Sequence, residues 1–126
     1  MAKTLVDAVL DASLDVIATA TKLMVCSSQP TTYTEAITTY ALGGVVVTAG
    51  DGNGDFTIAD GTTGRKVTVT QQTGVTVDAS GTATYVALVV TGTTTFLGTT
   101  SCTSQSVTAG NTMTINAFKC TIGDPT

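Results

Sequence analysis

Three oxygen-bearing side chains, spaced two residues apart in a glycine-rich segment, come closest to a site for chemistry. Asp51, Asn53 and Asp55 have the spacing of the first three ligands of a calcium-binding loop, whose carboxylate and amide oxygens suit a hard cation. The pattern then departs from such a loop, because Phe56 stands where the sharp turn needs glycine and Thr62 where a bidentate glutamate belongs. We interpret the segment as a tight turn built by Asp, Asn and Gly, with an incidentally bound cation as the alternative, and predict no dedicated metal site.

Groups suited to catalysis are scarce in the chain. It contains no histidine, so the Ser-His-Asp and Cys-His arrangements of nucleophilic catalysis cannot be built, and the usual general base near neutral pH is missing. Two carboxylates suffice for glycoside hydrolysis and nine acids are present, but most of them fall on one predicted helix or in glycine-flanked turns. The glycines before Arg65 and Lys66 lack the spacing of a phosphate-binding loop. The sequence therefore predicts a protein that is not an enzyme and has no cofactor.

The charge of the chain argues against two classes of partner. Five basic residues against nine acidic ones leave a formal net charge of −4, and the only adjacent basic pair is Arg65-Lys66, so there is no basic stripe for nucleic acid. No stretch approaches the roughly 20 apolar residues of a membrane span. Charged residues make up only 11%, against about 25% in typical soluble domains. We therefore expect protein partners to cover much of the surface, with a compact, neutral-surfaced domain as the alternative.

Residues 4–21 are predicted to form an amphipathic helix, which is treated as a segment of its own (1–21). Asp7, Asp11 and Asp15 share one helical face, which is either solvated or a docking surface for a basic partner. These acids interrupt the segment every fourth residue, so it is not a secretion signal, and we expect the protein to stay in the cytoplasm where it is made. The opposite, apolar face must be buried against the rest of the chain or a neighbouring subunit; it comprises Leu5, Val6, Val9, Leu10, Ala12, Val16, Ile17 and Ala20.

After residue 22 the apolar period changes from helical to two, and short strands recur about every 8 to 12 residues with turns between them. This pattern predicts one mainly β domain at 22–126, an antiparallel β-sandwich of jelly-roll or immunoglobulin-like type. The apolar run at 83–90 fits a central strand covered on both faces. A capping-box pattern predicts a helical turn at 33–39. The apolar phase changes in the last strand, which predicts a β-bulge near Ala117-Phe118.

Arg65 and Lys66 open a predicted strand directly after a turn. They form either a solvated pair at a strand end or ion pairs with the acidic face of the helix, within the chain or between subunits. Together with residues of the helix they make up the predicted interaction residues, which are Leu5, Val6, Asp7, Val9, Leu10, Asp11, Asp15, Arg65 and Lys66.

The three cysteines, Cys26, Cys102 and Cys120, are predicted to be reduced thiols, because an odd number of distant cysteines in a cytoplasmic chain does not suggest a disulfide framework. Cys26 and Cys120 stand among alternating apolar residues, so we expect both to be buried. No Cys-x-x-Cys spacing occurs, which argues against a zinc site.

Five segments resemble a family of small virion proteins of tailed bacteriophages. They occur in the order found in the family and cover most of the chain from Lys22 onward. The pattern SxSVxxGNTxTxxxF, followed by a proline-containing tail, is the most specific of them, whereas 45–57 is not matched and the N-terminal helix is similar only in character. The segments are KLMVCSSQPTTYTEA (22–36), GRKVTV (64–69), SGTATYVALV (80–89), SQSVTAGNTMTINAF (104–118) and IGDPT (122–126).

The resemblance implies a phage structural protein, best interpreted as a capsid decoration (cement) protein that is made in the host cytoplasm and resides on the virion capsid surface. Its implied partners are the major capsid protein and further copies of the chain, with a trimer favoured, because symmetric oligomers multiply weak contacts. It supplies no catalytic residues. Two other classes stay open: a tail, neck or fibre component, and a surface- or carbohydrate-binding sandwich. A sugar binder would normally present aromatic rings, and this chain has three Tyr, three Phe and no Trp.

Overall fold

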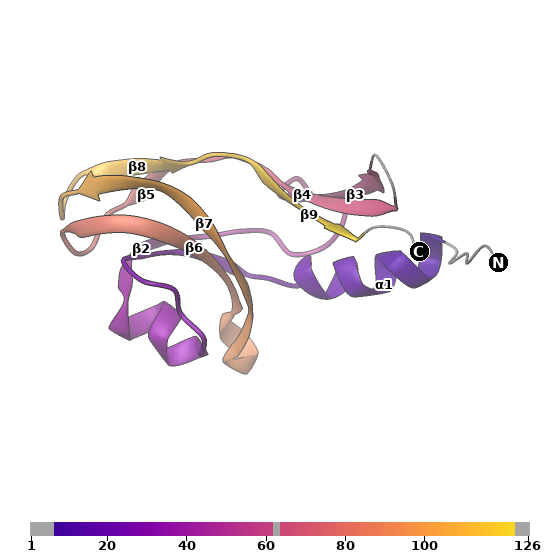
Figure 1. Ribbon diagram of the computed structural model, residues 1–126, viewed down its shortest axis with the longest axis horizontal. Helices are drawn as coiled ribbons and strands as arrows, with labels where there is room; N and C mark the ends of the chain where they lie inside the picture. Colours follow the sequence, from indigo (N-terminus) through magenta and orange to yellow (C-terminus); the bar gives the residue numbers. More distant parts are fainter. Residues whose placement is uncertain (1–6, 62–63, 123–126) are drawn as a thin grey trace. The chain divides into compact units, whose positions relative to one another are not determined.

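The computed structural model describes residues 7–61 and 64–122, and within them the predicted fold class is confirmed. The fold is mainly β, with antiparallel sheets and one short helix near the N-terminus, and is sandwich-like (Figure 1). Nine strands follow the helix in the described part of the chain. Threonine and valine are the commonest residues of these strands, and their β-branched side chains suit a pleated surface that is buried on one side.

The chain divides into two compact units, each assembled from separate stretches of sequence. Among the described residues, the unit that we call the helical unit comprises 7–19, 48–71 without 62–63, and 116–122. The other, which we call the β unit, comprises Ala20–Val47 and Gln72–Ile115. The expectation of two domains, 1–21 and 22–126, stays a prediction, because compact units of one chain need not fold independently.

In the helical unit, helix α1 (Asp7–Ile17) packs against a sheet of three strands, β3 (Phe56–Asp60), β4 (Arg65–Val69) and β9 (Phe118–Ile122). Strand β4 lies in the middle and pairs antiparallel with both neighbours (Figure 1). One face of the sheet is apolar: Phe56, Val67 and Val69 are fully buried there. Arg65 belongs to the same face by alternation and contacts the helix, so this apolar face is the one that α1 covers.

The buried side of α1 differs from the predicted apolar face. Leu10, Leu14 and Ala18 are 4%, 0% and 1% exposed and follow one another at intervals of four, which places them on one side of the helix. Leu14 was not part of the predicted face, whereas two members of that face, Ala12 and Val16, are exposed. The prediction was therefore wrong for these residues. Ile17 is half-buried and Ala20 is buried, while Leu5, Val6 and the side chain of Val9 lie outside the described residues.

The β unit contains a four-stranded sheet in the order β2-β1-β6-β7 and a two-stranded sheet of β5 and β8. The bounds of these strands are β1 Lys22–Cys26, β2 Ala41–Val46, β5 Gln72–Thr76, β6 Gly81–Val90, β7 Thr95–Val107 and β8 Thr112–Ile115. Strand β6, which covers the predicted central strand at 83–90, does lie between two neighbours, β1 and β7. The short 3-10 turn η2 (Thr91–Thr93) joins β6 to β7.

Strand β2 approaches β5 closely because Gly43 has no side chain. A Cβ atom at Gly43 would lie 2.3 Å from the carbonyl oxygen of Thr76 and 3.0 Å from Cε of Met113. Gly43 also forms an isolated antiparallel bridge with Val77, just beyond β5. A larger residue at this position would therefore push the two strands apart.

The predicted helical turn is present as the short π-helix η1 (Glu35–Thr39). Its start resembles a capping box: Glu35 N–H donates to Oγ1 of Thr32 at 3.2 Å, while the N–H and hydroxyl of Thr31 donate to Oε1 of Glu35 at 2.9 and 2.8 Å. These bonds, led by the one from the Thr31 backbone, lower the pKa of Glu35.

The phase change near the end of the chain has a different cause from the predicted bulge. Strand β8 ends at Ile115 and β9 begins at Phe118, with no strand at Asn116 and Ala117. Strand β8 pairs with β5 in the β unit, whereas β9 pairs with β4 in the helical unit. The bulge prediction was wrong, because the change of phase marks the passage of the chain from one sheet to another.

The burial of α1 predicts which helix residue matters for stability. Leu14→Ala should lower the free energy of unfolding by about 2–5 kcal/mol, since it removes a fully buried side chain and leaves a cavity. Val16→Ala is the matched control, because Val16 is 55% exposed and its loss should change stability by no more than about 0.5 kcal/mol. Urea unfolding of both variants measures the difference; a larger loss in Val16→Ala than in Leu14→Ala would contradict the assigned face.

Candidate interaction surfaces

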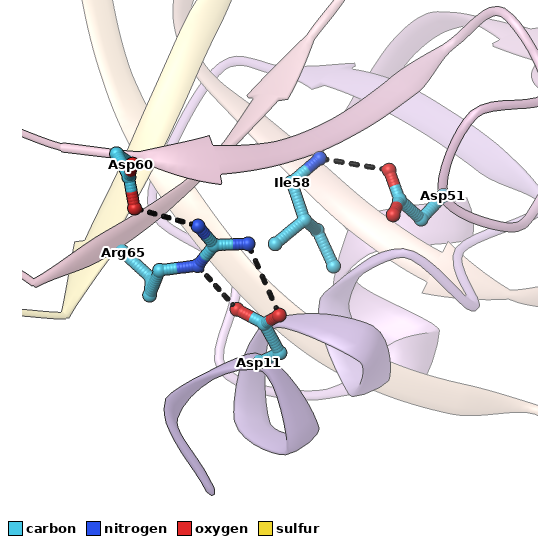
Figure 2. A network of polar contacts seen from close by, with 5 residues as sticks. All are labelled: Asp11, Asp51, Ile58, Asp60 and Arg65. Atoms are coloured by element: carbon cyan, nitrogen blue, oxygen red, sulfur yellow. Dashed lines mark hydrogen bonds and ion pairs between the residues drawn. The ribbon is translucent and has the colours of Figure 1, made fainter. Parts of the chain in front are cut away.

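Arg65 joins the helix to the sheet within the helical unit. Its Nε and Nη2 donate to Oδ1 and Oδ2 of Asp11 at 2.7 and 3.1 Å, a two-pronged pairing that matches the planar guanidinium to a carboxylate. Its Nη1 donates to Oδ1 of Asp60 at 2.7 Å, so that the guanidinium lies between the two carboxylates (Figure 2). The side chains of Arg65, Asp11 and Asp60 are 16%, 28% and 81% exposed. Of the two alternatives left open by the sequence, the structure shows for Arg65 the ion pair to the acidic face within the chain.

The acidic face of the helix is therefore not uniform. Asp11 is engaged by Arg65, Asp15 is exposed, and the side chain of Asp7 lies outside the described residues. Among the described acids of this face, only Asp15 is left for a basic partner, because the Asp11 carboxylate is already paired with Arg65.

Lys66 points to the opposite face of β4, so Arg65 and Lys66 do not form one basic site. The register pairs Lys66 with Ala59 on β3 and Thr121 on β9, and it pairs Thr68 with Thr57 and Lys119. Residues that pair directly share a face of the sheet. The face turned away from α1 therefore carries two lysines and no acid among its described residues, which are Thr57, Ala59, Lys66, Thr68, Lys119 and Thr121.

In the 51–55 turn, the three side chains with calcium-loop spacing each bond to the backbone just before the turn or to the next strand. Asp51 Oδ1 accepts from Ile58 N–H at 2.8 Å (Figure 2), and Asp55 Oδ2 accepts from Thr48 N–H at 2.6 Å. Asn53 Nδ2 donates to the Ala49 carbonyl at 2.9 Å. Turn formation thus accounts for all three side chains. In 7–61 and 64–122 there is no group of three or more His, Cys, Asp or Glu residues that could hold a metal ion.

A cluster of tyrosines on the β unit had not been identified as a site in the sequence. Tyr33, Tyr40, Tyr85 and Phe96 are half-buried and pack on one face of the four-stranded sheet beside η1, so the cluster holds four of the chain's six aromatic residues (three Tyr and three Phe). Tyrosine is enriched at protein interfaces because it joins a large apolar ring to a polar hydroxyl. The buried residues beneath this tyrosine cluster are Met24, Cys26, Ala36, Ala87 and Val89.

A signal for the tyrosine cluster does exist in the sequence. Tyr33, Ile37 and Tyr40 follow a spacing of four and three residues, which places them on one side of a helical turn. Tyr85 shares the phase of Ala87 and Val89 in β6, so it faces the same side of the sheet. What the sequence cannot supply is the pairing of β1 with β6, which brings these two groups together.

Strand β7 contains the longest run of exposed residues in the described β unit. Residues 101–106 are all exposed, and none of the 13 residues of β7 is charged. Its pairing with β6 is interrupted twice: Leu97 is an extra residue between Phe96 and Gly98, and 102–104 stand opposite Thr84 alone. These interruptions are β-bulges, which bend an edge strand and shorten its regular stretches.

The three cysteines are free thiols in different environments. Cys26 is buried, as predicted, and its Sγ lies 3.6 Å from the Ala36 carbonyl oxygen, to which it donates. Burial raises the pKa of Cys26 from 9.0 to about 11. Cys120 is only half-buried, contrary to the prediction, and Cys102 is exposed on β7.

No family model matches the chain, and no curated protein or solved structure matches it. Within the described residues, no helix is both long enough and apolar enough to cross a membrane.

The Arg65 pairing predicts an energetic coupling between helix and sheet. Asp11→Asn and Arg65→Gln should each lower the free energy of unfolding by about 1–3 kcal/mol, the range for hydrogen bonds to charged groups, and the double variant should lose less than the sum of the two. Asp60→Asn is the control, because a carboxylate that is 81% exposed contributes no more than about 1 kcal/mol. Additive losses in the double-mutant cycle would show that the pair is not coupled.

The buried thiol predicts a loss of stability at alkaline pH. Below pH 9 the Cys26 thiol keeps its proton in both the folded and the unfolded chain. Between 9.0 and about 11 only the unfolded thiol ionises, so the free energy of unfolding should fall by at most about 1.4 kcal/mol per pH unit. Urea denaturation of the parent protein and of Cys26→Ala at several pH values across this range separates the contribution of Cys26 from that of other titrating groups. The free energy of unfolding should fall less steeply with pH in the variant, and equal slopes would rule out Cys26 as the cause.

Proposed function

We propose that this protein is a structural component of a phage virion, a capsid decoration protein that binds the major capsid protein and its own copies on the head. The resemblance of five segments to small virion proteins of tailed phages supports this proposal. The structural observation that carries it is the scarcity of charge on the β unit, whose charged residues are Lys22, Glu35 and Asp78. Such a surface suits flat, extended contacts between proteins, because few of its charges have to be desolvated when a partner covers it.

A structural rather than catalytic role fits the way the carboxylates are used. Asp11 and Asp60 are bound by Arg65, Asp51 and Asp55 hold the backbone of their turn, and Glu35 caps η1. These five are among the nine acids of the chain, which also lacks histidine. Carboxylates engaged in this way stabilise local structure and are poorly placed to exchange protons with a substrate.

The tyrosine cluster is the surface that we assign to the capsid. Tyrosines that are half-buried in the free protein are already ordered, so little side-chain entropy is lost when a partner covers them. The same rings favour the second candidate function, carbohydrate binding, because aromatic faces stack on sugar rings. Strand β7 is long and has no charged residue, and this extended edge suits a protein partner better than a single sugar ring, which is why decoration is the function that we propose.

Reconstitution on heads tests the function. Virions made without this protein should still assemble but lose DNA more readily on heating or osmotic shock, and the purified protein should bind these depleted heads and restore their resistance. Five basic residues are too few for mainly electrostatic binding to heads, so the affinity for depleted heads should depend only moderately on salt concentration. Electron microscopy of labelled protein gives its location; decoration of tails instead of heads would replace the proposal by a tail, neck or fibre role.

A matched pair of variants tests the surface. Tyr33→Ala should weaken binding to depleted heads at least tenfold, whereas Tyr33→Phe keeps the ring and should bind nearly as the parent does. Circular dichroism confirms that both variants are folded. Equal binding by both would remove the tyrosine cluster from the interface, and retention of the parent protein on a glycan array, lost in Tyr33→Ala, would favour the carbohydrate-binding alternative.

A further inference from the structure

The four-stranded sheet of the β unit has one covered edge and one open edge. At the β2 edge, the backbone N–H groups of Asp78 and Ala79 donate to the Leu42 carbonyl at 2.7 and 3.0 Å, and Gly43 bridges to Val77. At the other edge, β7 pairs with β6, and no strand in the described part of the chain pairs with its outer side. The N–H and C=O groups along that side therefore face outward, ready to pair with another strand.

Strand β7 lacks the features by which proteins usually protect an open edge. Such edges carry lysines, other charges or proline, and β7 has none of these in its sequence TFLGTTSCTSQSV. The two bulges offer partial protection, because they limit regular pairing to short stretches. One of these stretches is 98–101, where four consecutive residues pair in register with β6. Beyond the second bulge, 105–107 also pair regularly.

We propose that β7 pairs with β7 of a second copy of this chain, antiparallel across a two-fold axis, so that two four-stranded sheets become one sheet of eight strands. A second copy is the partner indicated by the charges. Each copy carries a net charge of −4, so two copies repel each other at long range, whereas the β7 edge itself carries no charged residue.

The difference between the β2 and β7 edges indicates the symmetry of the contact between two copies. Among the described residues, β7 is the edge of this sheet with an unpaired outer side, and when such an edge meets its own copy the contact is self-complementary and closes after two copies. A head-to-tail contact between β7 and β2, which would allow unlimited growth, is obstructed at Leu42 and Gly43, where Asp78, Ala79 and Val77 already pair with β2. The inference is independent of the proposed function, since it concerns the protein in solution; it replaces the trimer expected from the resemblance by a dimer.

Measurement of the mass in solution tests the pairing. Sedimentation equilibrium over a range of concentrations should show monomers and dimers. Ser101→Lys and Gln105→Lys each place a positive charge on the exposed edge of both copies, and each should raise the dimer dissociation constant at least tenfold. Thr114→Lys is the control, because Thr114 is an exposed strand residue on β8 and should leave the constant unchanged. Unfolding curves verify that all three variants are as stable as the parent.

Several results would overturn the proposal. These are a monomer at every concentration, a trimer, a dimer that survives both β7 variants, and a dimer that is weakened only by Thr114→Lys. Salt gives an independent criterion: added salt should strengthen the dimer, since it screens repulsion between the acidic copies, whereas dissociation by salt would point to a charged interface elsewhere. Hydrogen exchange should show that backbone amides in 98–107 gain protection as the protein concentration rises.

Discussion

The fork of the Arg65 guanidinium determines how α1 lies on its sheet. A planar group that donates two parallel hydrogen bonds to one carboxylate fixes the direction of approach as well as the distance. Asp11 must therefore border the buried side of the helix, and this rotation places Leu10 and Leu14 against β4 while Val16 faces outward. The apolar residues of the helix surround most of its circumference, so hydrophobicity alone would not select this rotation.

The strands and the helix together show which features of the fold local sequence can and cannot predict. Alternation of apolar residues located the strands, and the continuous apolar run at 83–90 indicated the central position of β6, because both signals depend only on neighbouring residues. The rotation of α1 depends on the ion pair of Asp11 with Arg65, and these residues are 54 positions apart in the sequence. Local periodicity therefore contains no information about this rotation. The phase change after Ile115 was visible in the sequence, but a bulge and a change of sheet produce the same pattern.

For the candidate surfaces too, local sequence predicted local contacts but not contacts between distant residues. The residues of the 51–55 turn were identified correctly as turn formers, since Asp, Asn and Gly act on their own backbone. The tyrosine cluster was missed, because Tyr33 and Tyr85 become neighbours only through the pairing of β1 with β6. Arg65 and Lys66 were treated as one pair, although alternation along a strand sends adjacent side chains to opposite faces. That last point follows from strand geometry and was available from the sequence.

The alternation of the chain between its two units has a consequence for how such a protein can change. Val67 on β4 pairs with Cys120 on β9, 53 residues further along, and much of the β unit lies between them in the sequence. Neither unit corresponds to a continuous piece of sequence, so no single cut in the gene separates one from the other. A recombination event with one crossover within 20–115 would divide both units and join part of each to foreign sequence. The two units are therefore inherited together, and either can adapt to a new neighbour only by substitution within its own strands.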